Sequence, residues 1–385
     1  MTAPDSSRRG RRLLCTAVGL AGFCMALQMA LNTNFLVDEI RIGPARLGYL
    51  EACRESCGIA AFGFLALAAG WAEPLIGAVT LVLLAVGLSS YAFVHSYGTV
   101  VLLSLVWSQG LHVWMPLPNS MMLSLAEPGR AGHRLGQMGA AGAVGSGVSL
   151  ILAWVLLGLR VPLRAIFPVA GAAALLGAVA CLCIPRGIRT PSTRLVFRRR
   201  YGLYYLLCLL EGWRKQVFLA FAAFLLVRRH GTSPRQMLLL WMIVNLIGWM
   251  AAPRVGRLID RLGERRILVF YFSCLIWVFV GYAFMDSVYV LYGLFILDSS
   301  FFVFNAALTT YVNRIAPREE HTATLSMGVA MNHVAAVSMP FVGGLIWERL
   351  GHQWTFLVGA VAAAAAILAA ARIPFAARPA LHTGP

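Results

Sequence analysis

Two short clusters of charged residues interrupt segments of the sequence that are otherwise apolar. The first contains Glu51, Arg54 and Glu55, and the second contains Glu211, Arg214 and Lys215. In both clusters a glutamate is followed by an arginine at the third position and by another charge at the fourth, so on a helix the three side chains lie on one face. Such groups can pair with one another, bind a charged solute or carry a proton.

Lys215 is the only lysine among the 32 cationic side chains of the chain. A compact amine at this place, beside Arg214, suggests a binding site for a carboxylate or a phosphate. The alternative is a structural role, because Glu211 and Lys215 form an i,i+4 pair in the favourable order. The first cluster could likewise neutralise itself. The sequence leaves both interpretations open.

The surroundings of the two clusters indicate a membrane protein. Hydrophobic residues make up 59% of the 385 residues and charged residues 12%, whereas a soluble domain carries about 25% charged residues. The apolar runs are continuous and about 20 residues long, which fits helices that cross a bilayer. We therefore predict an all-α integral membrane protein with twelve transmembrane helices, near 13–36, 47–70, 74–95, 98–121, 134–158, 163–185, 201–227, 234–256, 267–286, 288–312, 322–347 and 354–372.

The distribution of the basic residues predicts the orientation and argues against a nucleic-acid partner for this chain of net charge +17. With the N-terminus in the cytoplasm, 21 of the basic residues lie in cytoplasmic segments, 8 on the other side and three within spans. This excess predicts a multi-pass plasma (inner) membrane protein with both termini cytoplasmic. A basic cytoplasmic linker, 186–200, separates two six-helix bundles, 1–185 and 201–385.

One loop carries a recognisable motif. The segment 256–266 reads GRLIDRLGERR and resembles the cytoplasmic loop motif of the major facilitator superfamily. The resemblance implies two pseudo-symmetric six-helix bundles, the major facilitator fold, and a conformational latch formed by Gly256, Asp260, Arg261, Gly263 and Arg265. The corresponding loop of the first half, 70–74, lacks the Asp-Arg pair, and Val106 stands where the family motif of the fourth span has an arginine. We therefore expect a latch on one half only.

In this superfamily the first, fourth, seventh and tenth spans line a central cavity, and polar residues within spans are costly unless they face a partner or water. From their depth we predict the substrate-binding residues to be Arg214, Lys215, Gln28, His112, Asn305 and Asn332. The predicted proton-coupling residues are Glu211, Asp298 and Glu55. The predicted external gate is formed by Glu51, Arg54 and Glu55, which we place in the outer third of their span.

The resulting prediction is a secondary active transporter that moves a small anionic or zwitterionic organic solute by alternating access coupled to protons. The alternatives are a non-transporting membrane sensor and an intramembrane enzyme that uses His112 or His333. No nucleophile motif, metal-ligand spacing or phosphate-binding loop is present, so we expect no enzyme activity, cofactor or metal site. The expected partners are the solute, the lipid bilayer and a proton or other coupling ion, and we expect a monomer that binds no nucleic acid.

Overall fold

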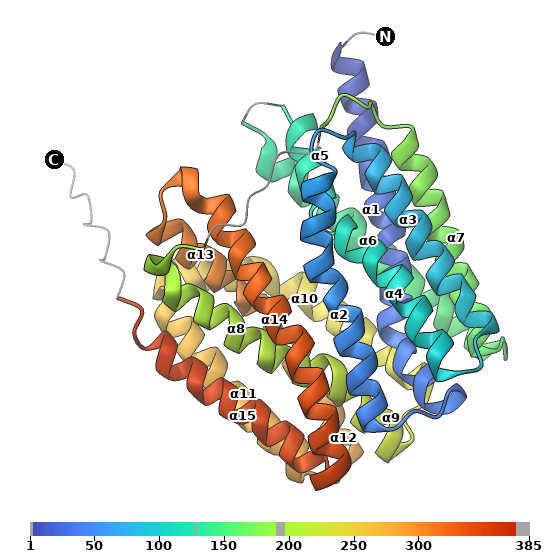
Figure 1. The fold of residues 1–385 in the computed structure, drawn as a ribbon, viewed down its shortest axis with the longest axis vertical. Coiled ribbons are helices and arrows are strands. Elements are labelled where there is room, and N and C mark those ends of the chain that lie inside the picture. The colour runs from blue at the N-terminus through green and yellow to red at the C-terminus, as the bar shows by residue number, and fades with distance from the viewer. Residues whose placement is uncertain (1–2, 128, 190–196, 375–385) are drawn as a thin grey trace.

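The computed structural model describes residues 3–127, 129–189 and 197–374. Within these residues the helices cross the molecule twelve times, and we call each crossing, made of one helix or of two consecutive helices, a pass (Figure 1). The first six are α1 (Ala3–Asn34), α2 (Pro44–Leu67), α3 (Glu73–Ser89), α4 (Tyr97–Trp114) with α5 (Leu117–Leu125), α6 (Ala131–Gly158) and α7 (Leu163–Leu182). The last six are α8 (Gly202–Gln216) with α9 (Ala223–His230), α10 (Pro234–Leu262), α11 (Glu264–Phe284), α12 (Val288–Phe301) with α13 (Ala306–Ile315), α14 (Arg318–Leu350) and α15 (His352–Ala370).

Ten of these passes are long and apolar enough to cross a membrane. The other two are α2, and α8 with α9, which are the passes that carry the two charged clusters. The prediction of an all-α membrane protein with about twelve spans is therefore confirmed. The predicted linker, 186–200, lies partly outside the described residues, since 190–196 are not among them.

The short connections between passes contain residues that favour the start of a helix. Pro44 and Pro74 occupy the first turns of α2 and α3, where a missing N–H costs nothing. Ser233 caps α10, because its hydroxyl accepts from the N–H of Gln236 at 3.4 Å while the Gln236 side chain accepts from the Ser233 N–H at 2.8 Å. These short turns keep successive passes antiparallel.

The passes are grouped in two halves that touch along two seams. In the first half α1 packs against α6 and α7, and α3 against α4 and α7. In the second half α8 packs against α14 and α15, and α11 against α15. The seams between the halves are formed by α2 with α14 and by α6 with α10, and Figure 1 shows α2 and α14 side by side.

The halves are closed at the end opposite the N-terminus, which we call the far end. There Asn34 Nδ2 donates to the carbonyl of Thr232 at 2.9 Å, and the N–H of Ala45 donates to Glu348 Oε2 at 3.0 Å. Gly48 lies so close to α14 that a Cβ on it would stand 2.2 Å from the carbonyl oxygen of Pro340. Only glycine allows this approach of two backbones.

At the near end, where the N-terminus lies, ion pairs join segments within each half. Glu127 pairs with Arg11 at 2.7 Å and with Arg134 at 2.9 Å, and hydrogen bonds from Arg134 lower the pKa of Glu127 to about 2. In the second half Glu264 pairs with Arg314 at 3.4 Å. Each of these pairs lies within one half and does not join the two halves.

The predicted latch lies at the turn between α10 and α11. Gly263 has φ +78, which a glycine adopts readily. Asp260 and Arg261 are exposed, and Arg265 Nη1 donates to the carbonyl of Ile373 at 3.5 Å. Asp260 forms no ion pair with another described residue. A latch function for these residues stays a prediction.

Candidate functional site

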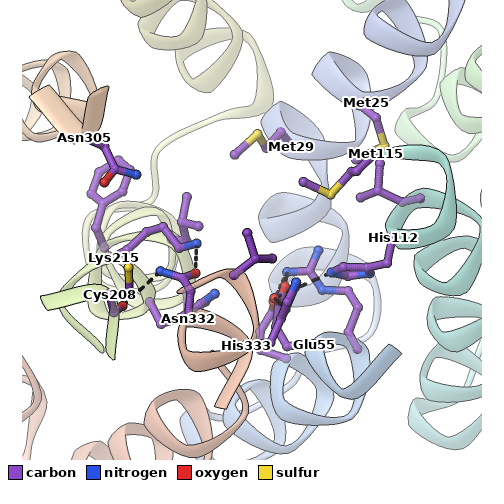
Figure 2. Close-up of a pocket in the computed structure, with 18 of the residues that line it drawn as sticks. Met25, Met29, Glu55, His112, Met115, Cys208, Lys215, Asn305, Asn332 and His333 are labelled. Carbon is purple, nitrogen blue, oxygen red and sulfur yellow. Dashed lines mark hydrogen bonds and ion pairs between the residues drawn. The ribbon is translucent and has the colours of Figure 1, made fainter. Parts of the chain in front are cut away.

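A cavity of about 510 Å³ lies between the halves and is lined by both. Figure 2 shows one wall that carries Lys215, Asn332 and Cys208, and an opposite wall that carries Glu55 and His112, with His333 beside them. The first-half residues come from α1, α2 and α4. The second-half residues come from α8 to α10 and from α12 to α14.

Lys215 supplies a cation to the second-half wall. Its Nζ donates a hydrogen bond of 2.5 Å to Asn332 Oδ1, and Asn332 Nδ2 donates to the carbonyl of Cys208 at 3.3 Å. The amide is thereby oriented with its oxygen toward the amine. Lys215 lies in the last turn of α8, directly before a π-helical segment, Val217–Ala222. Such segments re-aim side chains and are frequent at functional sites.

Glu55 is the centre of the first-half wall, halfway along α2. Its Oε1 accepts from Arg54 Nη2 at 3.3 Å, and Arg54 also pairs with the buried Glu51. Its Oε2 lies 3.8 Å from His112 Nε2 and 3.8 Å from His333 Nδ1. The Glu55 carboxylate therefore lies between two histidines, one from each half.

Arg214 lies behind the cavity wall and is completely buried. Its guanidinium donates to Glu211 Oε2 at 3.2 Å and to Asp298 Oδ1 at 3.1 Å. It also donates to the hydroxyl of Tyr271 at 2.6 Å, and that hydroxyl donates to Glu211 Oε1 at 2.9 Å. The arginine is thus fully occupied, because a buried cation needs partners on every side that water cannot reach.

The structure brings together most of the predicted site residues. Five of the six predicted substrate-binding residues line the cavity, namely Gln28, His112, Lys215, Asn305 and Asn332. Arg214 does not line it, contrary to its predicted position, and its neighbours Glu211 and Asp298 also stand outside the cavity lining.

The predicted gate residues, Glu51, Arg54 and Glu55, line the same cavity rather than the far end. The contacts that close the far end come from other residues, such as Asn34 and Glu348. A gating role for the cluster stays a prediction.

Sequence reasoning omitted several cavity residues from the predicted site. His333 is the most important, because it reaches Glu55 from the other half. Three methionines, Met25, Met29 and Met115, also line the cavity beside His112 (Figure 2). A polar residue at mid-span was the only signal for His333, and apolar methionines in an apolar span give none.

Comparisons with known sequences and solved structures agree with the fold that the sequence predicts. The sequence model described as Major Facilitator Superfamily matches residues 204–384. Solved transporters of this superfamily have the fold of the whole chain. The whole chain has the major facilitator fold, and its second half matches the sequence model of that superfamily. No curated protein matches it, and its subfamily is not determined by these similarities.

The similar structures cover both halves of this chain. The nucleoside transporter NupG in its D323A form is 16% identical, with a TM-score of 0.76 over 94% of this chain and 98% of that one. A bacterial homolog of the human lysosomal transporter Spinster, in an inward-facing and unoccupied conformation, is 13% identical, with a TM-score of 0.77 over 97% and 98%. A D-xylose–proton symporter is also 13% identical, with a TM-score of 0.73 over 96% and 98%.

The matched sequence model and the fold are those of multi-pass membrane transporters. At such low identity the similar structures establish the architecture alone. The solute and its driving force must therefore be argued from the cavity of this chain.

Proposed function

We propose that this protein is a secondary active transporter of a small zwitterionic or anionic organic solute. The observation that carries the proposal is the pairing of opposite charges across one cavity. Lys215 stands on the second-half wall and Glu55 on the first-half wall. A solute with a carboxylate at one end and a cationic or hydrogen-bonding group at the other would bridge the two halves.

Lys215 and Asn332 are the groups that would recognise the negative end of the solute. The amine supplies a charge, and the side-chain amide of Asn332 supplies a further polar contact beside it. The cavity of about 510 Å³ is in the range of ordinary ligand pockets and limits the solute to the size of a metabolite. Gln28 and Asn305 would contribute neutral hydrogen bonds.

Alternating access is supported by the contacts that join the halves at the far end and by the near-end ion pairs, which each lie within one half. If the termini are cytoplasmic, as the basic residues predict, the structure is inward-facing, and the solute exchanges with the cytoplasm of a cell whose plasma membrane holds the protein. Parting of α2 from α14 at Gly48 would open the other side. The two halves would then rock about the cavity.

The balance of charges around Arg214, which lies behind the cavity wall, supports proton coupling. Glu211 and Asp298 together bring two negative charges to the single positive charge of Arg214, and all three side chains are buried. An uncompensated charge in such a place is costly, so one carboxyl group would hold a proton. Asp298 is the better candidate, because its Oδ2 has no hydrogen-bond partner among the described residues. Glu55 remains a second candidate on the cavity wall.

Replacement of the cavity amine tests the proposal. A panel of zwitterionic and anionic solutes would be screened for thermal stabilisation of the purified protein, and any hit would be followed as labelled solute in proteoliposomes. Lys215→Met should reduce both stabilisation and counterflow at least tenfold, because the solute loses its charge partner. Arg228→Gln removes a charge at an exposed position and serves as the matched control.

Lys215→Arg should retain part of the transport if charge alone matters. Transport by Lys215→Met at the rate of the unmodified protein would contradict the proposal. Absence of stabilisation or flux with every solute of the panel would also contradict it.

A further inference from the structure

We propose that Glu55, His112 and His333 form a binding site for a divalent transition-metal ion at the seam between the two halves. The carboxylate oxygen and the two ring nitrogens lie within 4.8 Å of one another. Two imidazoles and one carboxylate are a ligand set that suits zinc and its first-row neighbours. This inference goes beyond solute transport, although it uses Glu55, which the proposed function also places on the cavity wall, and its test measures metal binding alone.

The hydrogen bonds of His112 give its ring the orientation of a metal ligand. Its Nδ1 lies 2.8 Å from the carbonyl oxygen of Ser108 and 3.1 Å from the Ser108 hydroxyl, which itself donates to the carbonyl of Arg54 at 2.8 Å. Because a carbonyl oxygen only accepts, Nδ1 carries the hydrogen. In the neutral ring Nε2 then presents its lone pair to Glu55. Metal-binding histidines commonly donate their other N–H to a backbone carbonyl in this way.

Two acceptors that face each other require a cation between them. The lone pair of His112 Nε2 and the Oε2 of Glu55 are 3.8 Å apart, and His333 Nδ1 is as far from the same oxygen. His333 Nδ1 is buried and has no hydrogen-bond partner among the described residues. The three atoms thus converge on one point that none of them can satisfy by direct hydrogen bonding unless a ring gains a proton.

The backbone of α2 is shaped to admit the histidine from the other half. A Cβ built on Gly58 would stand 2.2 Å from Cε1 and 2.3 Å from Nδ1 of His333. Any larger residue would push the imidazole away from Glu55. His333 is therefore placed against α2 by a glycine one turn beyond the carboxylate.

The charges of the wall favour a cation. Arg54 neutralises one of the two glutamates of its cluster through close ion pairs, so Glu51, Arg54 and Glu55 together keep one negative charge. Arg54 contacts Oε1 of Glu55 and leaves Oε2 for the ion. Tetrahedral zinc holds its ligand atoms about 3.4 Å apart, with bonds of about 2.1 Å. The two separations from Glu55 Oε2 are 3.8 Å, and all three ligand atoms lie within 4.8 Å of one another, so binding of an ion would draw them closer together.

The ligands come from α2 and α4 of the first half and from α14 of the second. The site is complete only while α14 lies against α2, which is the state with the far end closed. A bound ion would therefore hold that state, and its fourth coordination position would face the cavity. This site was not predicted from the sequence, because its three residues lie far apart in the chain and form no spacing motif.

Metal binding to the purified full-length chain tests the inference without any transport assay. The protein, freed of its purification tag and of metal by a chelator, would be titrated with Zn²⁺ by calorimetry and with Co²⁺ by visible absorption. We expect one ion per chain and the d–d absorption band of four- or five-coordinate Co²⁺. Glu55→Gln and His333→Ala should each lower the Zn²⁺ affinity at least tenfold, and His133→Ala, at an exposed position, should leave it unchanged.

Thermal unfolding in chelator would show that each variant is folded. Gly58→Val supplies a second route, because it retains all three ligands and displaces His333; it should lose the Co²⁺ band. The inference is overturned if no stoichiometric ion binds, in which case the cation between Glu55 and His112 is a proton. It is also overturned if Glu55→Gln and His333→Ala bind Zn²⁺ as tightly as the control.

Discussion

Arg214 and Lys215 are neighbours in the chain and have different environments. Lys215 lines the cavity, and Arg214 is enclosed by Glu211, Asp298 and Tyr271. Successive residues of a helix point about 100° apart, so both cannot face one cavity squarely. The sequence analysis predicted that both would bind the solute, whereas only Lys215 lines the cavity.

Asp298 allows a sharp test at the scale of one residue. Asp298→Asn imitates a protonated carboxyl group and leaves Arg214 paired with Glu211, so the protein should remain folded. We expect solute exchange across proteoliposomes to persist while accumulation driven by a pH gradient is lost, because the proton no longer binds and leaves. The measurement compares counterflow with uptake under an imposed gradient.

Asp286→Asn, at an exposed carboxylate that pairs with Arg229, is the control and should remain driven by the gradient. If Asp298→Asn accumulated the solute under a pH gradient as strongly as the unmodified protein does, Asp298 would not be the proton-coupling residue. Glu55 would then be the next residue to test.

At the scale of elements, the apolar runs predicted the passes well because the lipid imposes their length. The passes of α2 and of α8 with α9 were also predicted as apolar runs, each interrupted by a charged cluster, although neither is among the ten passes that are long and apolar enough by themselves. The break between α4 and α5 at Met115 and the π-helical turn after α8 were not predicted. The first has a local cause in Pro116 and Pro118 at the start of α5.

The crossing of α2 and α14 should be sensitive to a single side chain. Gly48→Val would place atoms within 2.2 Å of the Pro340 carbonyl, so the far end should open more often. With Cys208 as the sole cysteine, a small membrane-impermeant thiol reagent added outside the cell should label the cavity several-fold faster in this variant. Gly63→Val is the matched control, because nothing lies within 4 Å of a Cβ there.

Equal labelling of the two variants would show that the contact at Gly48 does not hold the far end shut. Labelling of Cys208 must also be absent in the Cys208→Ser protein, which identifies the reactive thiol.

At the scale of the whole molecule, the predicted orientation can be tested directly. Cys183 is exposed after the sixth pass, and Arg41 is exposed after the first. In a chain without its other cysteines, Cys183 should react with an impermeant reagent in inverted vesicles and not in intact cells. Arg41→Cys, in the same background with Cys183 replaced, should show the reverse pattern. The opposite result would invert the topology and turn the inward-facing state into an outward-facing one.

The twelve-pass fold could be predicted because it follows from local composition and from the charge of the loops. The site could be predicted only in part. Lys215, His112 and Asn332 were recognisable as polar residues in the middle of predicted spans. The contact between Glu55 and His333 could not be predicted, because it forms only when two helices from different halves pack together. Which residues share a cavity depends on the packing of the halves.

The far end is closed largely by main chain, with Gly48 and Gly344 against the backbone of the opposite helix. A contact of this kind has a kinetic consequence. Burial of a long side chain costs up to about 2 kcal/mol of rotamer freedom, and glycine loses no side-chain freedom at all. Closure at these two glycines therefore immobilises no long side chain, and beyond it only a few side chains, such as those of Asn34 and Glu348, are ordered at the far end. The closed and open states can therefore stay close in free energy. A carrier with such a closure is suited to repeated cycling under a weak driving gradient.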